Sequence, residues 1–390
     1  RDRNIFLYLL YDFVFGLYPI IPIMSLFFLA RQLSFADIGI LFAVFSLSGF
    51  IFEIPTGYIG DKYGRKNSVM IGLAILAVTA YTWTVITSVF VFAIFAAIWM
   101  LGLAFISGSF EGYIYDYLKS LQREGEYDHL ISLSGTVLYF AGAVGSILGA
   151  YLFSLNILYP YYLLAGLFSL CIFIVLFMGP DPKIPDGNIG NQLKIFSGLK
   201  YILQNKSLLW ITLYVSLLFG LFSYFRGSVD KPYILSLELF DVKWLGVFVA
   251  LSMLVQSGFM SQFAKIKSKL GENKLIALFW TMSSLPLLIM SISHGYLALI
   301  AMIIYYTTES FQEALINSFC QKHIPSKIRA TTLSSIKVYL NIRGAVLGIS
   351  AGLIFNIFDI RTGFMIAFGY TVVVLILTQS YKQLTHLQFS

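Results

Sequence analysis

Carboxylic acids stand inside several long apolar stretches of this sequence. Asp12, Glu53 and Glu111 each lie among mostly aliphatic and aromatic neighbours. An ionised side chain in such surroundings is costly, so each acid is expected to face a wet cavity or a partner charge. A protonated carboxyl is neutral, and such a group could load and release a proton. The three acids predict proton coupling or substrate contact, with fixed hydrogen bonding between helices as the alternative.

Asp12 also has aromatic neighbours. Their ring faces could attract a cationic substrate through cation–π contacts. An ion pair with a base of another helix is the other possibility, and it stays open which base that is. The rings are Tyr8, Tyr11 and Phe15, and the available bases are Arg226 and Arg343.

A second group of charges lies towards the C-terminal end. Glu309 and Glu313 are four residues apart, which places them on one face of a helix. Like charges so close disfavour double ionisation, so one carboxyl would hold a proton. Arg343, in the following apolar stretch, is a candidate partner. These residues predict either a cavity site or bracing between helices.

These residues must be positioned by membrane-crossing helices. The 390 residues are 58% apolar and 12% charged, against about a quarter charged in soluble proteins. One crossing needs roughly 20 apolar residues, and the pattern predicts an all-α protein with twelve crossings. They lie at about residues 5–29, 38–60, 68–87, 90–118, 129–153, 159–178, 207–228, 243–264, 274–293, 295–320, 329–356 and 361–380.

The twelve segments fall into two halves. Residues 1–178 hold six and residues 207–390 hold six, while residues 179–206 carry prolines, glycines and an amphipathic stretch typical of a linker. Short basic turns follow the second helix of each half. Such internal symmetry is typical of a two-bundle transporter whose binding site lies near the midplane.

The net charge of +7 reflects basic residues gathered in alternate loops. This pattern follows the positive-inside rule, so it indicates topology and not a nucleic-acid partner. It predicts a multi-pass protein of a plasma membrane with both termini cytoplasmic. The few charged residues and the many Phe, Ile and Tyr favour a prokaryotic inner membrane. The outer loops then hold little basic charge beyond Arg31, Lys231, Lys243 and Arg361.

One inner loop has residue types that could form a conformational latch. Its glycines permit close helix approach and a tight turn, and its aspartate could pair with the arginine four residues on. A basic residue that follows a proline in a later inner loop is a plausible part of the surface that this loop contacts. The loop residues are Gly57, Asp61, Gly64, Arg65 and Lys66, and the later residue is Arg329. Asp116 is expected to pair with Lys119 or Arg123.

The segment from Gly57 to Val69 resembles the signature loop of the major facilitator superfamily. The segment from Pro325 to Thr331 is similar to another loop of that family. This resemblance covers the whole chain and implies two pseudo-symmetric six-helix bundles, with the Asp61 loop latching the cytoplasmic side. The run at Ser107–Ser109 and the pair Glu111–Gly112 resemble the exporter branch. However, the fourth segment lacks the arginine of many drug exporters, and the glycines of the fifth lack the antiporters' proline.

These observations favour a proton-coupled exporter of small amphipathic or cationic molecules, working by alternating access. Proton-coupled import of a metabolite is the alternative, and a non-transporting sensor or scaffold is a third reading. No metal cluster, nucleophile–base set or nucleotide loop is visible, so no enzyme activity, metal or cofactor is expected. The expected partners are a small-molecule substrate, protons and the lipid bilayer, and we expect a monomer.

Overall fold

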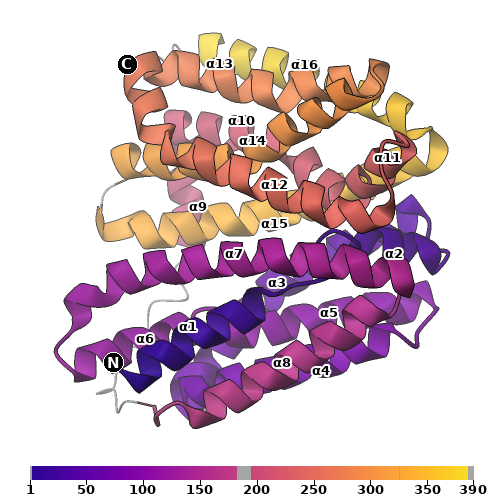
Figure 1. Ribbon diagram of the computed structural model, residues 1–390. Helices are drawn as coiled ribbons and strands as arrows, with labels where there is room; N and C mark the ends of the chain where they lie inside the picture. Colours follow the sequence, from indigo (N-terminus) through magenta and orange to yellow (C-terminus); the bar gives the residue numbers. More distant parts are fainter. Residues whose placement is uncertain (1, 182–194, 325, 385–390) are drawn as a thin grey trace. The chain divides into compact units, whose positions relative to one another are not determined.

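The computed structural model describes residues 2–181, 195–324 and 326–384, and it leaves out the side chains of some helical residues within these ranges. Within the described residues the regular structure is helical throughout (Figure 1). In chain order the helices are α1 (Arg3–Gly16), α2 (Met24–Ala30), α3 (Phe35–Tyr63), α4 (Arg65–Trp83), α5 (Val89–Ile106), α6 (Ser109–Ser120), η1 (Glu124–Glu126), α7 (Tyr127–Leu155), α8 (Tyr159–Phe177), α9 (Ile195–Gln204), α10 (Lys206–Ser228), α11 (Asp230–Ser236), α12 (Val242–Ser261), α13 (Phe263–Ile292), α14 (Tyr296–His323), α15 (Ser326–Ile357) and α16 (Ile360–Leu384).

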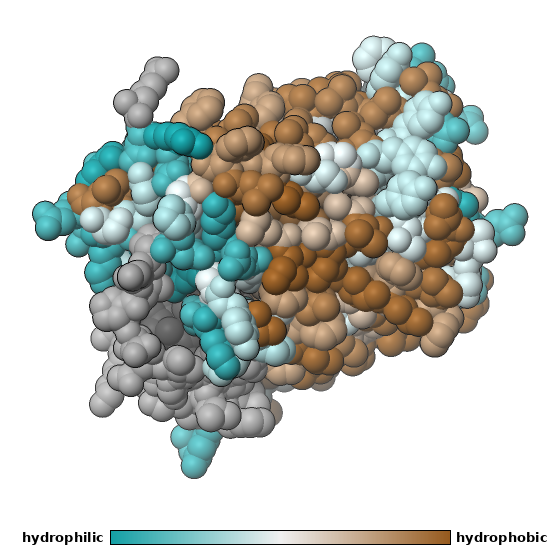
Figure 2. Space-filling view, turned by 90° about the horizontal axis from the view of Figure 1, so that it is seen from below, coloured by the Kyte–Doolittle hydropathy of each residue, from teal (hydrophilic) through white to brown (hydrophobic). Residues whose placement is uncertain are grey.

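Eight segments of the described chain are long and apolar enough to cross a membrane. They correspond to eight of the twelve predicted crossings, and α1–α2, α4, α10 and α14 lie at the other four. Figure 2 shows one face of the molecule covered by a broad hydrophobic band, with hydrophilic residues gathered mainly at one end. A surface of this kind is suited to hydrocarbon and not to water.

Two predicted crossings are broken, contrary to the single helices expected at 5–29 and 90–118. In the first, α1 ends at Gly16 and α2 begins at Met24, and Pro19 and Pro22 lie between them. Proline lacks the amide hydrogen that a helix interior needs, so it ends the helix there. In the second, Gly108 separates α5 from α6 with φ of 71°, a left-handed conformation that glycine adopts readily.

The chain divides into two compact units, each described here by itself. Unit 1 comprises Arg1–Gln32, Val44–Gly190 and Phe240–Leu251. In it α1 packs on α7 and α8, and α4 packs on α5 and α8. Its interior is rich in aromatic rings, among them the stacked pair Trp83 and Trp99, whose centroids are 5.2 Å apart. Aromatic contacts thus join α4, α5 and α8.

Unit 2 comprises Leu33–Ala43, Asn191–Leu239 and Ser252–Ser390. Here α10 packs on α14, α15 and α16, while α13 packs on α14 and α16. The linker helix α9 packs on α15, and its Ile202 is buried in the apolar core of this unit. Residues 182–194 of the predicted linker lie outside the described part.

Glycines allow two close crossings. In unit 1, a Cβ added at Gly149 of α7 would meet the Pro19 carbonyl oxygen at 1.8 Å. In unit 2, a Cβ added at Gly352 of α15 would lie 2.7 Å from the Phe35 carbonyl oxygen and 3.0 Å from the Gly39 Cα. Only glycine fits at such contacts, which explains two of the glycines that recur at four-residue spacing in the sequence.

Candidate functional site: charged networks among the helices

The basic turn predicted between the second and third crossings is very short. Helix α3 continues to Tyr63 and α4 begins at Arg65, so Gly64 alone separates them. Gly64 has φ of 101°, and a Cβ there would lie 2.5 Å from an Asp181 carboxylate oxygen. Both observations explain why glycine is required at this turn.

Arg65 joins two acids in this part of unit 1. Its Nη1 atom donates to Oδ2 of Asp116 at 2.6 Å, and its Nε atom lies 3.5 Å from Oδ1 of Asp61. The pairing of Asp61 with Arg65 is as the sequence predicts. Of the two expected partners of Asp116, Arg123 is wrong, because it pairs with Asp2 and Glu126 instead, while Lys119 is close enough to attract the Asp116 charge without forming a described ion pair. Arg65 therefore ties α3 and α4 to α6.

The position of Arg65 depends on a glycine of α6. A Cβ added at Gly112 would lie 2.1 Å from the Arg65 Nη1 atom and 2.6 Å from its Cζ atom. Gly112 is one helical turn before Asp116, so the guanidinium lies across the bare backbone to reach the carboxylate. This role of Gly112 is a geometric one that the sequence pattern did not indicate.

Asp181 supplies the N-terminal cap that α4 lacks. Its two carboxylate oxygens accept from the Lys66 backbone amide at 3.0 and 3.3 Å. A negative charge at a helix N-terminus also interacts favourably with the helix dipole. The Lys66 Nζ atom donates to the carbonyl oxygens of Leu176 and Met178. Burial lowers the pKa of this ammonium, and the nearby Asp181 charge partly offsets that effect.

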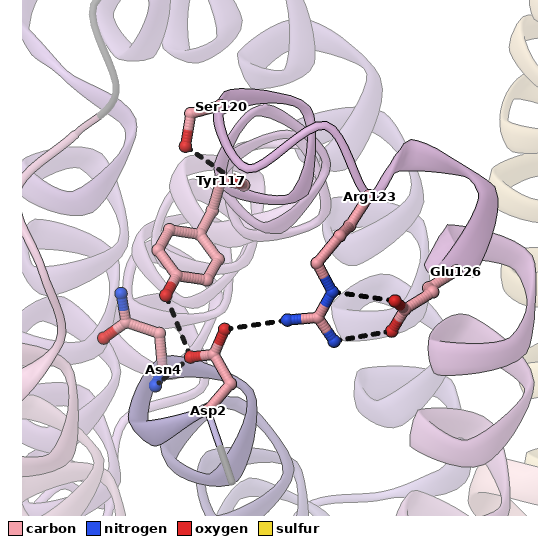
Figure 3. Close-up of polar contacts among 6 residues, drawn as sticks. All are labelled: Asp2, Asn4, Tyr117, Ser120, Arg123 and Glu126. Atoms are coloured by element: carbon pink, nitrogen blue, oxygen red, sulfur yellow. Dashed lines mark hydrogen bonds and ion pairs between the residues drawn. The ribbon is translucent and has the colours of Figure 1, made fainter.

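A second network joins the start of α1 to the end of α6 (Figure 3). The Tyr117 hydroxyl donates to Asp2 Oδ1 at 2.8 Å, and Arg123 Nη1 donates to Asp2 Oδ2 at 3.3 Å. Arg123 also makes two bonds of 2.7 Å to the Glu126 carboxylate. Asp2 meanwhile caps α1 by accepting from the Asn4 amide. One carboxylate therefore links α1, α6 and the chain beyond it.

Asp12 is the most enclosed of the predicted acids. It is 4% exposed in α1, and its Oδ2 atom has no hydrogen-bond partner in the described chain. Ser134 of α7 lies beside it and is also 3.5 Å from the Tyr8 hydroxyl. Glu111 of α6 is close enough to repel the Asp12 charge. The structure thus brings together two of the acids that the sequence singled out.

Several of the predicted acids and bases have no described polar bond. The exposed side chains of Glu53 and Glu111 have no hydrogen bond or ion pair to any residue that the structure describes. Gly57 lies within α3. The side chains of Glu313 and Arg329 lie outside the described part, so their roles stay predictions.

Unit 2 pairs one predicted acid with a base. Glu309 of α14 forms an ion pair with Arg226 of α10. Beside them lie Asp230 and Lys231, which are 1% and 3% exposed. Lys231 was expected in an outer loop, but α11 continues the helical path past Ser228 and buries it. The sequence signal for this pair was an adjacent acid and base directly after an apolar stretch.

Arg343 of α15 is buried at 9% exposure. Its Nη1 atom donates to the Ser216 carbonyl oxygen of α10, and its Nε atom has no hydrogen-bond partner among the described residues. The side chain therefore bonds to the backbone of α10 and not to Glu309.

A helical protein with many segments long and apolar enough to cross a membrane is a multi-pass membrane protein. A model of the Major Facilitator Superfamily matches residues 5–348, and the chain belongs to this superfamily of transporters. It binds a small-molecule substrate and is not an enzyme. The all-helical fold that the sequence predicts is confirmed.

Relatives and solved structures are similar over differing lengths. The chain is 25% identical to the uncharacterized MFS-type transporter YxaM of Bacillus subtilis (strain 168), over 91% of this chain and 89% of that protein. It is also 25% identical to the quinolone resistance protein NorA of Staphylococcus aureus, over 46% of this chain and 44% of that protein. The crystal structure of the nucleoside transporter NupG has a TM-score of 0.76 at 17% identity, covering 98% of this chain and 99% of that chain.

Proposed function

We propose that the protein exports small amphipathic or cationic molecules in exchange for protons, by alternating access. The observation that carries the proposal is Asp12, an almost fully buried carboxyl with one unpaired oxygen inside a helical bundle. Such a group is costly unless it is used. We further propose that both termini are cytoplasmic, as the distribution of basic residues predicts.

We infer exchange of substrate for protons because a proton and a cationic substrate compete for the same carboxylates. The Glu111 carboxylate is close enough to add to the negative charge at Asp12, which favours the binding of a cation there. A proton and a cationic substrate cannot both neutralise one carboxylate at the same time. Binding of one therefore promotes release of the other, which is the requirement for antiport.

The direction of transport is supported by the partial likeness to the quinolone resistance protein, a protein named for resistance to a toxic compound. Aromatic rings around Asp12 suit an amphipathic cation. Tyr11 lies 4.1 Å from Phe110 and 5.4 Å from Phe15, measured between ring centroids. These rings and Asp12 together favour a substrate with an apolar body and a positive group.

The test is transport of the cationic dye ethidium in liposomes that contain the purified chain. With an imposed proton gradient, the parent should drive dye against its concentration gradient. The Asp12→Asn variant should lose the response to the proton gradient but keep downhill dye movement. Asp241→Asn, at an exposed ion pair, is the matched control and should behave as the parent.

Two outcomes would count against the proposal. If the parent moves the dye independently of the proton gradient, the proposal of proton coupling is wrong. The second outcome is that the parent protects an efflux-deficient bacterium against none of the cationic, neutral and anionic toxic compounds tested. If it speeds uptake of a metabolite instead, import and not export is the function. Glu53→Gln and Glu111→Gln should be compared in the same growth assay.

A further inference from the structure

Unit 2 contains a buried arginine that the proposed exchange at Asp12 does not use. Arg343 lies in Val338–Ile357, one of the segments long and apolar enough to cross a membrane, and it is 9% exposed. Its Nη1 atom donates to the Ser216 carbonyl oxygen, but its Nε atom has no hydrogen-bond partner among the described residues. Leaving a buried charged donor unpaired is costly. This donor therefore favours a ligand beside Arg343.

The described side chains that act on the charge of Arg343 are phenols. Tyr339 and Tyr370 are both close enough to that charge to affect it. The Tyr370 hydroxyl donates to the Leu217 carbonyl oxygen at 3.3 Å, next to the Ser216 carbonyl that Arg343 occupies. The Ser216 hydroxyl in turn donates to the Tyr339 hydroxyl at 3.3 Å. A neutral phenol does not neutralise a guanidinium, so no described side chain matches the positive charge.

An apolar cavity of about 300 Å³ begins one helical turn along α15 from this arginine. Residues of α10, α15 and α16 line it, and ligand sites in proteins have volumes of about 300–1,000 Å³. Its polar lining side chains are already bonded, because the Ser350 hydroxyl donates to the Val346 carbonyl oxygen and the Tyr370 hydroxyl to that of Leu217. The other lining residues are aliphatic, aromatic or glycine. The cavity therefore suits the apolar part of a ligand.

Tyr370 and the spacing along α15 connect the cavity to the charge. Tyr370 lines the cavity and is also one of the two phenols beside Arg343. Arg343, Leu347 and Ser350 follow one another at intervals of four and three residues, so they lie along one face of the helix. Leu347 and Ser350 both line the cavity. A ligand whose apolar body fills the cavity can therefore place a polar end beside Arg343.

We propose that this cavity binds an amphipathic carboxylic acid, with its carboxylate on Arg343 and its apolar body among the lining residues. A carboxylate supplies the acceptor that Nε lacks and matches the planar donors of a guanidinium. An amphipathic amine would place a second positive charge beside the first, and an alcohol would leave the charge unmatched. The cavity lies in unit 2 and Asp12 lies in unit 1, so this site is separate from the proposed exchange site. The inference goes beyond the proposed function and does not depend on it.

The test measures binding of radiolabelled phenylbutyrate to the purified full-length chain in lipid nanodiscs at neutral pH. Empty nanodiscs measure partition of the label into lipid, which is subtracted. Unlabelled phenylbutyrate, phenylbutanol and phenylbutylamine, which share one skeleton and differ in the polar end, are compared as competitors. We expect saturable binding, and we expect the acid to compete at least about tenfold more strongly than the alcohol or the amine, because only the acid makes a charge-assisted bond.

Variants assign the binding to the arginine and to the cavity separately. Arg343→Gln should weaken binding of the acid about tenfold or more, because it removes the charge. Ala367→Leu should also weaken binding, because it fills part of the cavity from α16 and keeps the arginine. The matched controls are Lys243→Gln, which removes an exposed base, and Gly369→Ala, where an added Cβ meets nothing within 4 Å. Both controls should bind the acid as the parent does.

Three results would overturn the proposal. The first is an absence of saturable binding, which is expected if an acid outside the described residues already neutralises Arg343. The second is equal competition by the three compounds. The third is unchanged binding by folded Ala367→Leu or folded Arg343→Gln. Thermal unfolding shows whether each variant is folded, and the comparison of competitors needs no variant. Asp12→Asn should bind the acid normally, so failure of proton-coupled export and failure of this site are distinguishable.

Discussion

Nη1 of Arg65 and Oδ2 of Asp116 lie 2.6 Å apart although the two residues are 51 positions apart in the sequence. The contact joins the start of α4 to α6 across the backbone of Gly112. Asp61 of α3 approaches the same guanidinium less closely and is more exposed. The closer of the two ion pairs of Arg65 is therefore the one with α6, and the sequence motif contains only the other.

Gly112→Ala should displace Arg65 from Asp116. The added methyl group would overlap the guanidinium, which is the flexible end of a side chain, so the helices should stay folded. We expect the transport rate to fall several-fold and the free energy of unfolding to fall by about 1 kcal/mol. Transport in liposomes and thermal unfolding measure the two effects.

The matched control is Gly135→Ala in α7, where an added Cβ meets nothing within 4 Å. Its transport should equal that of the parent. Equal transport by Gly112→Ala and the parent would show that the contact of Arg65 with Asp116 does not affect the transport cycle.

Asp181→Ala should destabilise the start of α4. The variant loses the side-chain acceptor of the Lys66 amide, and loss of an N-terminal cap costs about 1 kcal/mol. Asp181→Asn keeps an acceptor oxygen and should cost less. Thermal unfolding of both variants checks the order, and equal stability of the two with the parent would exclude a capping role.

The Asp2 network should contribute through Tyr117 more than through Glu126. A double-mutant cycle of Asp2→Asn and Tyr117→Phe should give a coupling energy of about 1 kcal/mol, because this hydrogen bond is partly buried. Glu126→Gln should change stability less than Tyr117→Phe does, since its pair with Arg123 is exposed. A larger effect of Glu126→Gln would contradict this ranking.

Gly352→Ala should destabilise unit 2. The new methyl group would be within 3.0 Å of backbone atoms of α3, which cannot move aside as a flexible side chain can. We expect a loss of about 1–3 kcal/mol, as for other overpacked contacts. Gly369→Ala in α16 has open space at its Cβ and should be as stable as the parent by thermal unfolding.

Asp230→Asn should be the most destabilising of these changes. It leaves Lys231 buried without its counter-charge, at a cost of about 3–5 kcal/mol. Replacing both residues in Asp230→Asn with Lys231→Met should recover much of that loss, because no charge is then buried. If the double variant unfolds more readily than the single one, the pair is stabilising for a reason other than charge balance.

The sequence predicts the helical fold well because each crossing is a local run of apolar residues. Gly64 and the pairing of Asp61 with Arg65 were predictable for the same reason, since a turn and a four-residue spacing are local patterns. The break near Pro19 had a local signal too, because prolines stand inside the first apolar run. Its location was missed because the run as a whole is long enough for one crossing.

Contacts between distant segments could not be predicted in this way. Asp116 was assigned to near neighbours, although its partner Arg65 comes from another helix. Asp181 and Gly112 have roles only because α4, α6 and the end of α8 meet in space. Lys231 was expected in an outer loop, and its burial is acceptable because it pairs with Asp230.

The burial of Lys231 also changes the count of basic residues from which the orientation of the chain is predicted. A lysine whose charge is matched by Asp230 inside a bundle is not available to lipid headgroups, so it does not belong among the outer-loop bases. Removing it leaves Arg31, Lys243 and Arg361 on that side against the many lysines and arginines of the other. In the orientation proposed above, the outer side of the folded protein therefore carries fewer accessible bases than the sequence count suggested.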